Sequence, residues 1–348
     1  MLQNFIARFI IISNYCRTVD RQGRTVGAHL SGGVVMRRYI IKRILLMFLL
    51  LLGMSFIVFA SLYIAPGDPA AMVAGPSATD ADIEVVRTSL GLDKPFFVQY
   101  FIYLRNLLTL NLGTSYTTRQ PILDEILVRL PNTLNLACAS IIIAVVVGIP
   151  CGIITALKKD KLTDNILTTG SLVGISIPNF LLGTLLMYVF AVKLGWLPTG
   201  GMTHFFWTPT GLREAILPAI ALSTATVASF TRIGRSAMLD VLQSDYIRTA
   251  KSKGLKKKTI IFVHALRNAL IPLVTQFGTS FGGLLGGAII TEQVFVINGV
   301  GTYLITAINN RNYPVVQSTV LVIATIFIII NLIVDLLYCV IDPRISYE

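Results

Sequence analysis

Charged residues are scarce in this sequence of 348 residues. Asp, Glu, Lys and Arg make up 13% of the chain, whereas a soluble globular domain carries about 25%. Hydrophobic residues account for 54%, and they are gathered into long uncharged runs of the kind that a bilayer requires. The composition excludes a water-soluble enzyme and indicates an integral membrane protein.

The sequence also lacks the motifs of common catalytic and metal sites. It contains no G-x-x-x-x-G-K-S/T phosphate-binding loop, its three histidines lie in different predicted loops or tails, and its four cysteines show neither metal-ligand nor redox spacing. We therefore expect no catalytic residues, metal site, disulfide framework or bound cofactor in this chain. The residues concerned are His29, His204, His264, Cys16, Cys138, Cys151 and Cys339.

The chain contains six stretches that are long and uncharged enough to cross a membrane. A span needs about 20 apolar residues to cover a hydrocarbon core of about 30 Å. The sequence therefore predicts an all-α integral membrane protein with six transmembrane helices. The stretches are residues 44–65, 134–157, a helix within 165–192, 215–231, 268–291 and 314–341, the last interrupted by Asp335.

Basic residues predict the orientation of these spans. The net charge of +12 would suggest nucleic acid in a soluble chain, but in a membrane protein Lys and Arg mark the loops that stay in the cytoplasm. Residues 232–267 hold nine basic and two acidic residues, whereas residues 66–133 hold five basic and seven acidic residues. We expect no nucleic-acid partner, both termini in the cytoplasm and residues 66–133 outside.

These assignments divide the chain into four parts. Residues 36–65 form the first transmembrane helix, 66–133 the external segment, and 134–348 a five-helix core with a cytoplasmic loop at 238–267. Residues 1–35 form an N-terminal extension whose apolar patch is too short for a span and lacks a signal-cleavage pattern. We expect the functional chain to begin at Met36; the alternative is a disordered cytoplasmic tail.

The external segment contains an amphipathic pattern. Apolar residues recur at helical spacing between Phe97 and Leu108, which predicts a helix against the membrane or against the external ends of the spans. Its apolar stripe serves either for packing or for docking an external partner.

The basic cytoplasmic loop has the pattern of two short helices joined by a turn. A helix-compatible run ends at Gly254, which can adopt positive φ, and a second amphipathic run leads into the fifth span. Such an element suits a cleft in another protein. The alternative is a basic loop that only fixes orientation.

This loop and other segments of the chain carry short motifs in a characteristic order. The motifs are Asp245-Tyr246-x-Arg248-Thr249-Ala250-x-x-Lys253-Gly254, His264-Ala265-Leu266-Arg267-Asn268-Ala269-x-x-Pro272, Pro66-Gly67-Asp68-Pro69, Leu90-Gly91-Leu92-Asp93-x-Pro95, Leu112-Gly113-x-Ser115, Leu194-Gly195-Trp196-Leu197-Pro198 and Asp342-Pro343-Arg344. In these motifs the chain resembles the inner-membrane permeases of ATP-binding-cassette importers for dipeptides, oligopeptides, glutathione and nickel, and the loop resembles their coupling loop. The basic Lys256-Lys257-Lys258 run departs from the family pattern, and residues 1–35 have no counterpart in it.

The resemblance implies a non-catalytic subunit of a larger machine in a bacterial or archaeal inner membrane. Its implied partners are a second, similar permease, two ATPases that use ATP and Mg, and an external substrate-binding protein. Closure of the ATPases would move the coupling loop and tilt the spans between inward-open and outward-open states. By resemblance, the coupling residues are Asp245, Tyr246, Thr249, Ala250, Lys253, Gly254 and Leu255.

The fifth span carries closely spaced glycines beside a few polar residues. Small residues four apart permit close helix approach in lipid, so these glycines serve either packing within the subunit or the seam with a second permease. The neighbouring polar groups are candidates to line the translocation path, although a lone hydroxyl can bond back to its own helix. The glycines are Gly278, Gly282, Gly283, Gly286 and Gly287, and the polar residues are Gln276, Thr279 and Ser280.

The resemblance implies uptake of short peptides, including di- and oligopeptides and glutathione. A nickel or metal-chelate importer is the alternative within the family. A proton-coupled secondary carrier acting alone is a further alternative, because Asp335 is an intramembrane carboxylate that calls for a partner or a role. Such a carrier would show inverted repeats and more intramembrane charge, which the sequence lacks, and Asp335 also fits a cap or ion pair at the cytoplasmic rim.

Overall fold

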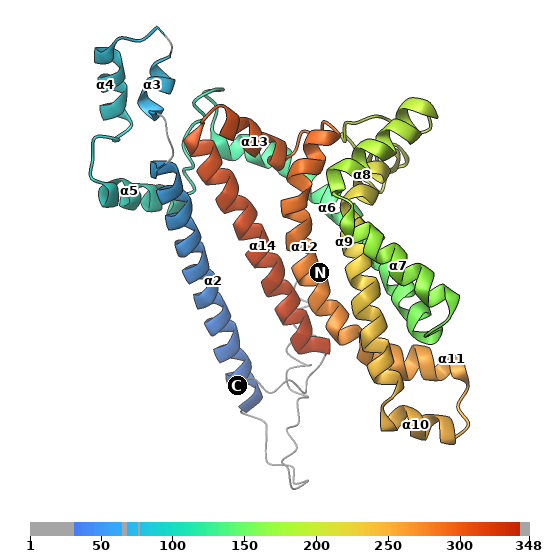
Figure 1. Ribbon diagram of the computed structural model, residues 1–348. Coiled ribbons are helices and arrows are strands. Elements are labelled where there is room, and N and C mark those ends of the chain that lie inside the picture. Colours follow the sequence, from blue (N-terminus) through green and yellow to red (C-terminus); the bar gives the residue numbers. More distant parts are fainter. Residues whose placement is uncertain (1–30, 65–67, 76, 342–348) are drawn as a thin grey trace.

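The computed structural model describes residues 31–64, 68–75 and 77–341. In these ranges the chain is built from helices, and a single isolated bridge joins Thr114 to Pro121 (Figure 1). The helices are α2 (Ser31–Ile64), α3 (Pro69–Ala74), α4 (Asp80–Ser89), α5 (Phe96–Leu108), α6 (Ile122–Leu157), α7 (Leu162–Ser176), α8 (Asn179–Leu186), η1 (Met187–Lys193), α9 (Pro209–Leu242), α10 (Asp245–Ser252), α11 (Lys257–Thr259), η2 (Ile260–Ala265), α12 (Leu266–Val294), α13 (Val300–Asn309) and α14 (Tyr313–Ile341).

Five helical stretches are long and apolar enough to cross a membrane. They lie in α2, α6, α9, the continuous stretch from α11 to α12, and α14. A sixth span is made by α7 together with α8 and η1, if that bent pair counts as one crossing. The all-α membrane fold predicted from the uncharged runs is therefore confirmed.

The third span differs from its prediction. Instead of one helix within residues 165–192, the chain forms two helices that meet at an angle of 101°. The break falls at Ile177 and Pro178, where Ile177 has extended backbone angles. A proline disfavours helical geometry in the residue before it and supplies no N–H to the helix, which explains why α7 stops at Ser176.

Two spans extend well beyond the uncharged runs from which they were predicted. Helix α6 begins at Ile122 rather than residue 134, and α9 covers Pro209–Leu242 rather than residues 215–231. The added turns contain charges with partners: Arg129 lies 3.7 Å from Glu125 and 4.4 Å from the centre of the Tyr303 ring, and Arg235 lies 2.7 Å from Asp164. Pairing lowers the cost of placing charge within a long helix, so counting uncharged residues underestimated both helices.

The core is formed where α6 and α9 cross, with α12 and α8 packed around them. Two glycines of α6 bring the backbones together: a Cβ on Gly148 or Gly152 would lie 2.8 Å from the carbonyl oxygen of Val227 or Thr231. Small residues at such a crossing give close packing where lipid supplies no hydrophobic drive. This crossing fixes the frame to which the cytoplasmic loop is attached.

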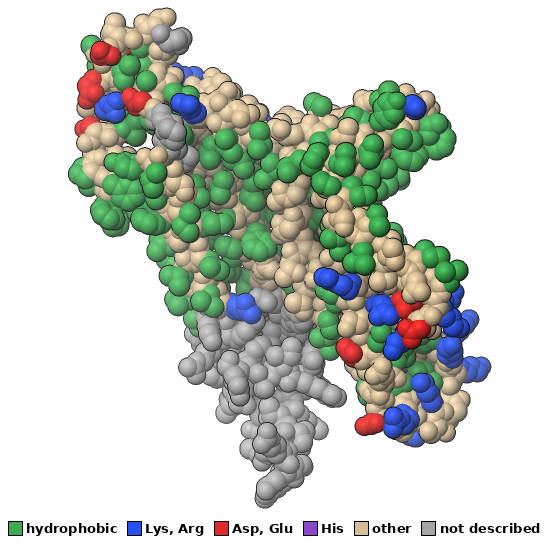
Figure 2. Space-filling view, viewed as in Figure 1, with side chains coloured by type: hydrophobic (Ala, Val, Ile, Leu, Met, Phe, Trp, Pro, Cys, Tyr) green, Lys and Arg blue, Asp and Glu red, His purple; other side chains and the backbone are tan. Residues whose placement is uncertain are grey.

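Charge separates the two ends of the molecule (Figure 2). Lys and Arg side chains gather around α10, α11 and the neighbouring ends of α7 and α9, while α4 at the opposite end carries Asp80, Asp82 and Glu84. Helix α2 starts, and α14 ends, at the basic end (Figure 1). That this end faces the cytoplasm stays a prediction, and residues 1–30 and 342–348 lie outside the described part of the chain. The predictions that the chain starts at Met36 and that Asp342-Pro343-Arg344 belongs to the family pattern therefore stay predictions.

A short helix that the sequence analysis did not identify, α13, joins the fifth and sixth spans at the acidic end. Glu292, buried at the end of α12, accepts hydrogen bonds from the Thr302 N–H at 2.9 Å and the Thr133 hydroxyl at 2.6 Å. The same Thr133 hydroxyl accepts the Val300 N–H at 2.8 Å. The Glu292 carboxylate thus accepts a hydrogen bond at the start of α13, where the first N–H groups have no acceptor within the helix itself.

Candidate coupling site and translocation face

The basic loop at 238–267 folds as the predicted helix-turn-helix, with α10 held against the ends of the spanning helices. Ile247 and Ala250 on α10 are buried in an apolar cluster with Met238 of α9, Ile261 of η2 and Ala156 of α6. This cluster is separate from the main core. Helix α10 contacts η2, which continues into α12, and its buried side chains share this cluster with residues of α9 and α6.

Gly254 makes the turn after α10. Its φ is +74°, and nothing lies within 4 Å of where a Cβ would stand. The Leu255 N–H donates to the Ala250 carbonyl, and the Gly254 N–H donates to the Lys251 carbonyl at 3.0 Å. This pair of bonds is the Schellman arrangement that ends helices at a left-handed glycine, and the positive φ expected from the sequence is confirmed.

The predicted coupling residues divide into an exposed and a buried set. Asp245, Thr249 and Lys253 are exposed, so a partner can reach them. Ala250 is buried against the cluster, so its side chain supports the position of α10, and its part in coupling stays a prediction. Leu255 is 41% exposed and lies just after the turn.

Tyr246 connects α10 to the helix that carries the translocation candidates. Its hydroxyl accepts a hydrogen bond of 2.6 Å from the Asn268 side-chain amide, at the start of α12. In the chain between these two residues, α11 and η2 follow the turn at Gly254 and continue directly into α12. Helix α10 is therefore connected to α12 through a hydrogen bond, the apolar cluster and a continuous helical stretch. Sequence analysis quoted Asn268 within a motif but gave it no role, because its partner is 22 residues away.

A second connection joins α7 to α9 near the same end. Asp164 is buried and receives two hydrogen bonds from the Arg235 guanidinium, at 2.8 and 2.7 Å, and one from the Asp160 N–H. Bidentate geometry makes this pair directional as well as strong. The sequence alone does not predict this ion pair, because 71 residues separate Asp164 from Arg235.

The glycines of α12 are divided between two faces. Gly278 and Gly282 face α14, where an added Cβ would lie 2.8 Å from Val334 and 2.0 Å from Phe327. Gly287 approaches Leu222 of α9. The glycines on the other face, Gly283 and Gly286, are exposed and have nothing within 4 Å. Gly278, Gly282 and Gly287 therefore serve packing within the subunit, whereas a seam with a second permease at Gly283 and Gly286 stays a prediction.

Among the three polar candidates of α12, Thr279 is the exposed one, on the same side as the exposed Thr275, Gly283 and Gly286. The Thr279 hydroxyl donates to the Thr275 carbonyl at 3.3 Å, as a lone hydroxyl in a helix often does. Ser280 is buried within this chain and accepts a hydrogen bond of 2.8 Å from Gln276, and the assignment of these three residues to the path stays a prediction. Asp335 lies in α14, but its side chain is outside the described residues and its role stays a prediction.

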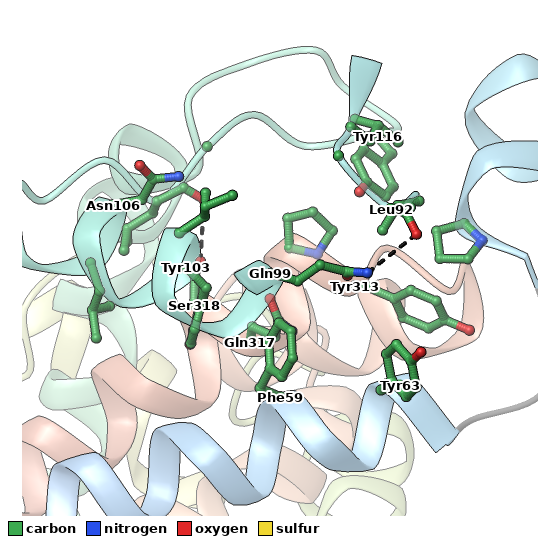
Figure 3. Close-up of a pocket in the computed structure, with 18 of the residues that line it drawn as sticks. Phe59, Tyr63, Leu92, Gln99, Tyr103, Asn106, Tyr116, Tyr313, Gln317 and Ser318 are labelled. Atoms are coloured by element: carbon green, nitrogen blue, oxygen red, sulfur yellow. Dashed lines mark hydrogen bonds between the residues drawn. The ribbon is translucent and has the colours of Figure 1, made fainter. Parts of the chain in front are cut away.

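A cavity of about 430 Å³ lies at the acidic end, between the external segment and the start of α14 (Figure 3). Phenol and amide side chains from α2, α5 and α14 surround it, and burial raises the pKa of Tyr116 to about 12, so that phenol remains protonated. Within the described residues no group of three His, Cys, Asp or Glu is placed to hold a metal ion. The labelled lining residues are Phe59, Tyr63, Leu92, Gln99, Tyr103, Asn106, Tyr116, Tyr313, Gln317 and Ser318.

Long apolar helices, joined at a basic end by a helix-turn-helix, define an all-α multi-pass membrane protein. Residues 148–347 match the family model of the binding-protein-dependent transport system inner membrane component, and residues 36–137 match the model of the N-terminal part of such components. The chain belongs to this family, the permeases of ATP-binding-cassette importers.

Several relatives have assigned transport systems. The chain is 42% identical over 333 residues to the dipeptide transport system permease protein of Alkalihalophilus pseudofirmus, covering 90% of this chain and 100% of that one. It is 42% identical over 313 residues to the glutathione transport system permease protein of Escherichia coli, with the same coverage. A chain of the inward-facing MetNI methionine ABC transporter shares its fold, with a TM-score of 0.53, 18% identity, and coverage of 64% of this chain and 99% of that one.

Proposed function

We propose that this chain is one of two permease subunits of an ATP-driven importer for short peptides. The observation that carries the proposal is the attachment of α10 to α12. An exposed helix at the basic end is packed and hydrogen-bonded to the span whose outer face holds Thr279, Gly283 and Gly286.

In this proposal the exposed face of α10 sits in a groove of a partner ATPase. Asp245, Thr249 and Lys253 supply polar contacts, and Gly254 sets the direction of the chain as it leaves the groove. This chain binds no nucleotide; ATP and Mg act in the two ATPases. When the ATPases close, α10 moves as a rigid part of the subunit and changes the tilt of α12.

The translocation path lies along the open face of α12, against a second permease. Gly283 and Gly286 expose the helix backbone there, and Thr279 adds a hydroxyl to the same face. Such a surface permits close approach of a second helix and leaves room for a peptide backbone when the two subunits separate. An external binding protein delivers the substrate.

The substrate class follows from the relatives. Permeases of dipeptide and glutathione systems are equally similar to this chain, and both substrates are short peptides with free charged ends. A nickel or metal-chelate importer remains the alternative within the same family.

Purification and uptake test the proposal. The chain is purified with an affinity tag from its own host, and its co-purifying proteins are identified. Uptake of labelled dipeptide, glutathione and nickel is then compared between host cells with and without the chain. We expect two ATPase subunits and a second permease in the complex, and loss of dipeptide or glutathione uptake. Transport by the chain alone, or loss of nickel uptake only, would contradict the proposal.

Substitution Tyr246→Phe tests the connection itself. Removing the hydroxyl deletes the hydrogen bond to Asn268 and leaves Asp245, Thr249 and Lys253 unchanged. A net hydrogen bond is worth roughly 1 kcal/mol, so uptake is expected to fall by up to about fivefold while the ATPases remain bound. The matched control is Tyr188→Phe on the exposed surface of η1, which is expected to transport normally.

A further inference from the structure

Helix α5 presents two different faces. One face packs on the outer end of α2: the Phe96 ring lies 4.9 Å from that of Tyr63, and the Tyr100 ring lies 5.4 Å from that of Phe59. The Tyr100 hydroxyl also hydrogen-bonds Ser55 at 3.0 Å. These contacts fix the position of α5 relative to a transmembrane helix.

The other face of α5 is apolar and uncovered. Phe97, Phe101 and Leu108 are 65%, 67% and 76% exposed, and their spacing of four and seven residues places them on one side of the helix. Leu104 falls on the same side by spacing. Large apolar side chains so exposed on one helix face mark an interaction surface rather than ordinary scatter.

The depth of α5 can be measured along α2. The apolar part of α2 begins at Arg43, and its ring partners Phe59 and Tyr63 lie 16 and 20 residues further along the helix. At 1.5 Å per residue these positions are about 24 and 30 Å from Arg43, whereas the hydrocarbon core is about 30 Å thick. Helix α5 is therefore attached at the outer boundary of the hydrocarbon.

The orientation and charge of the surroundings agree with this depth. Helix α5 lies across the outer end of α2 rather than along it (Figure 1). Hydrophobic side chains follow α5, whereas the Asp and Glu side chains of α4 lie further from the membrane spans (Figure 2). The single charged residue within α5 is Arg105, whose charge suits lipid phosphate, and aromatic residues are typical of the membrane interface.

We propose that α5 is an interfacial helix whose apolar face, formed by Phe97, Phe101 and Leu108, is buried in the outer leaflet of the bilayer. Its occupant is phospholipid, because the face continues the lipid-exposed surface of α2, of whose apolar stretch only 6% is buried in the protein. The helix holds α3 and α4 at a fixed height above the membrane. This inference concerns a surface of the external segment and does not depend on the proposed substrate.

Tryptophan fluorescence in lipid tests the proposal. Both native tryptophans are first removed by Trp196→Phe and Trp207→Phe. In this background either Phe101→Trp or Phe97→Trp places a single tryptophan on the apolar face of α5. The full chain is reconstituted in nanodiscs of phosphatidylethanolamine and phosphatidylglycerol, with or without chains brominated near the acyl carbonyl. An interfacial helix lies about 5–10 Å below the headgroup boundary, so the probe is expected to lose roughly half of its emission to the brominated lipid.

The matched control is Val85→Trp, on the exposed surface of α4. Its emission is expected to be quenched by aqueous iodide and unaffected by brominated lipid. Iodide quenching of the probe at position 101 or 97 as strong as that at position 85 would overturn the proposal, because it would place α5 in water. Protection of the probe from both quenchers would also overturn it, because another protein surface would then cover the face.

Discussion

Gly254 illustrates how one residue without a side chain decides the path of a loop. Because the space around it is open, a substitution there is limited by backbone conformation and not by crowding. For an L-residue the left-handed conformation costs about 1–2 kcal/mol, and Asn tolerates it better than a β-branched residue. Any disturbance therefore acts on the direction in which the chain leaves α10.

We expect Gly254→Val to reach the membrane at near-normal levels but to lose uptake or its ATPases, and Gly254→Asn to retain much of both. Lys257→Ala, a neighbouring change in the basic run, is expected to behave like the parent. Co-purification of the ATPases and uptake in the same cells measure these outcomes. Full transport by Gly254→Val with its ATPases bound would remove the docking role from this turn.

Glu292 is the second residue whose removal should be informative, since its carboxylate serves donors from α6 and α13 together. A buried donor left without a partner costs roughly 1–3 kcal/mol, so Glu292→Ala is expected to lower the thermal unfolding temperature of the purified protein. The adjacent exposed residue supplies the control, Gln293→Ala, for which no change is expected. Equal unfolding temperatures for the two variants would show that Glu292 does not hold the start of α13.

At the scale of elements, the crossing of α6 and α9 depends on close backbone approach. A Cβ at Gly152 would meet the Thr231 carbonyl at 2.8 Å, and backbone atoms cannot move aside as a side chain can. Overpacking of this kind costs about 1–3 kcal/mol, so we expect Gly152→Ala to reduce the yield and unfolding temperature of the purified protein. Gly170→Ala on α7, where nothing lies within 4 Å, should leave both unchanged. If Gly152→Ala is as stable as Gly170→Ala, the two helices are not held at this distance.

The elements also show what the sequence can and cannot predict. Uncharged runs located every long helix, because hydrocarbon tolerates few unpaired charges. The true ends of α6 and α9 were hidden because their added turns contain paired charges, Arg129 with Glu125 in α6 and Arg235 of α9 with the distant Asp164. Pro178 indicated a possible break in the helix, but the sequence did not predict the angle between α7 and α8. Helix α13 is too short to be predicted from its hydrophobic pattern.

The same contrast applies to the candidate site. The turn at Gly254 was predictable because positive φ is a local property of glycine. The burial of Ala250 and Ser280, and the contact of Tyr246 with Asn268, depend on packing between elements. Sequence therefore located the helix-turn-helix correctly, while the direction of each side chain required the fold; its docking role stays a prediction.

For the whole molecule, the separation of charge between the two ends predicts sidedness that can be measured in cells. In a cysteine-free background, Val85→Cys on α4 is expected to react with a membrane-impermeant maleimide in intact spheroplasts. Lys257→Cys on α11 should react only after the membrane is opened. Both positions are exposed, so a failure to react reflects sidedness and not burial. Labelling of Lys257→Cys in intact spheroplasts would reverse the proposed orientation.

Helix α2 has a consequence for how the protein is made. Its main partner among the spanning helices is α14, yet about 250 residues separate Ile64 from Tyr313. At a synthesis rate of about 5–20 residues per second, α2 stays in the bilayer for roughly 10–50 s before that partner emerges from the ribosome. Its apolar residues are spread evenly around the helix, and a helix that is apolar on every side is stable in lipid without a protein neighbour. The uniformly apolar surface of α2 thus suits a helix that remains in the bilayer without a protein partner until α14 has been synthesised.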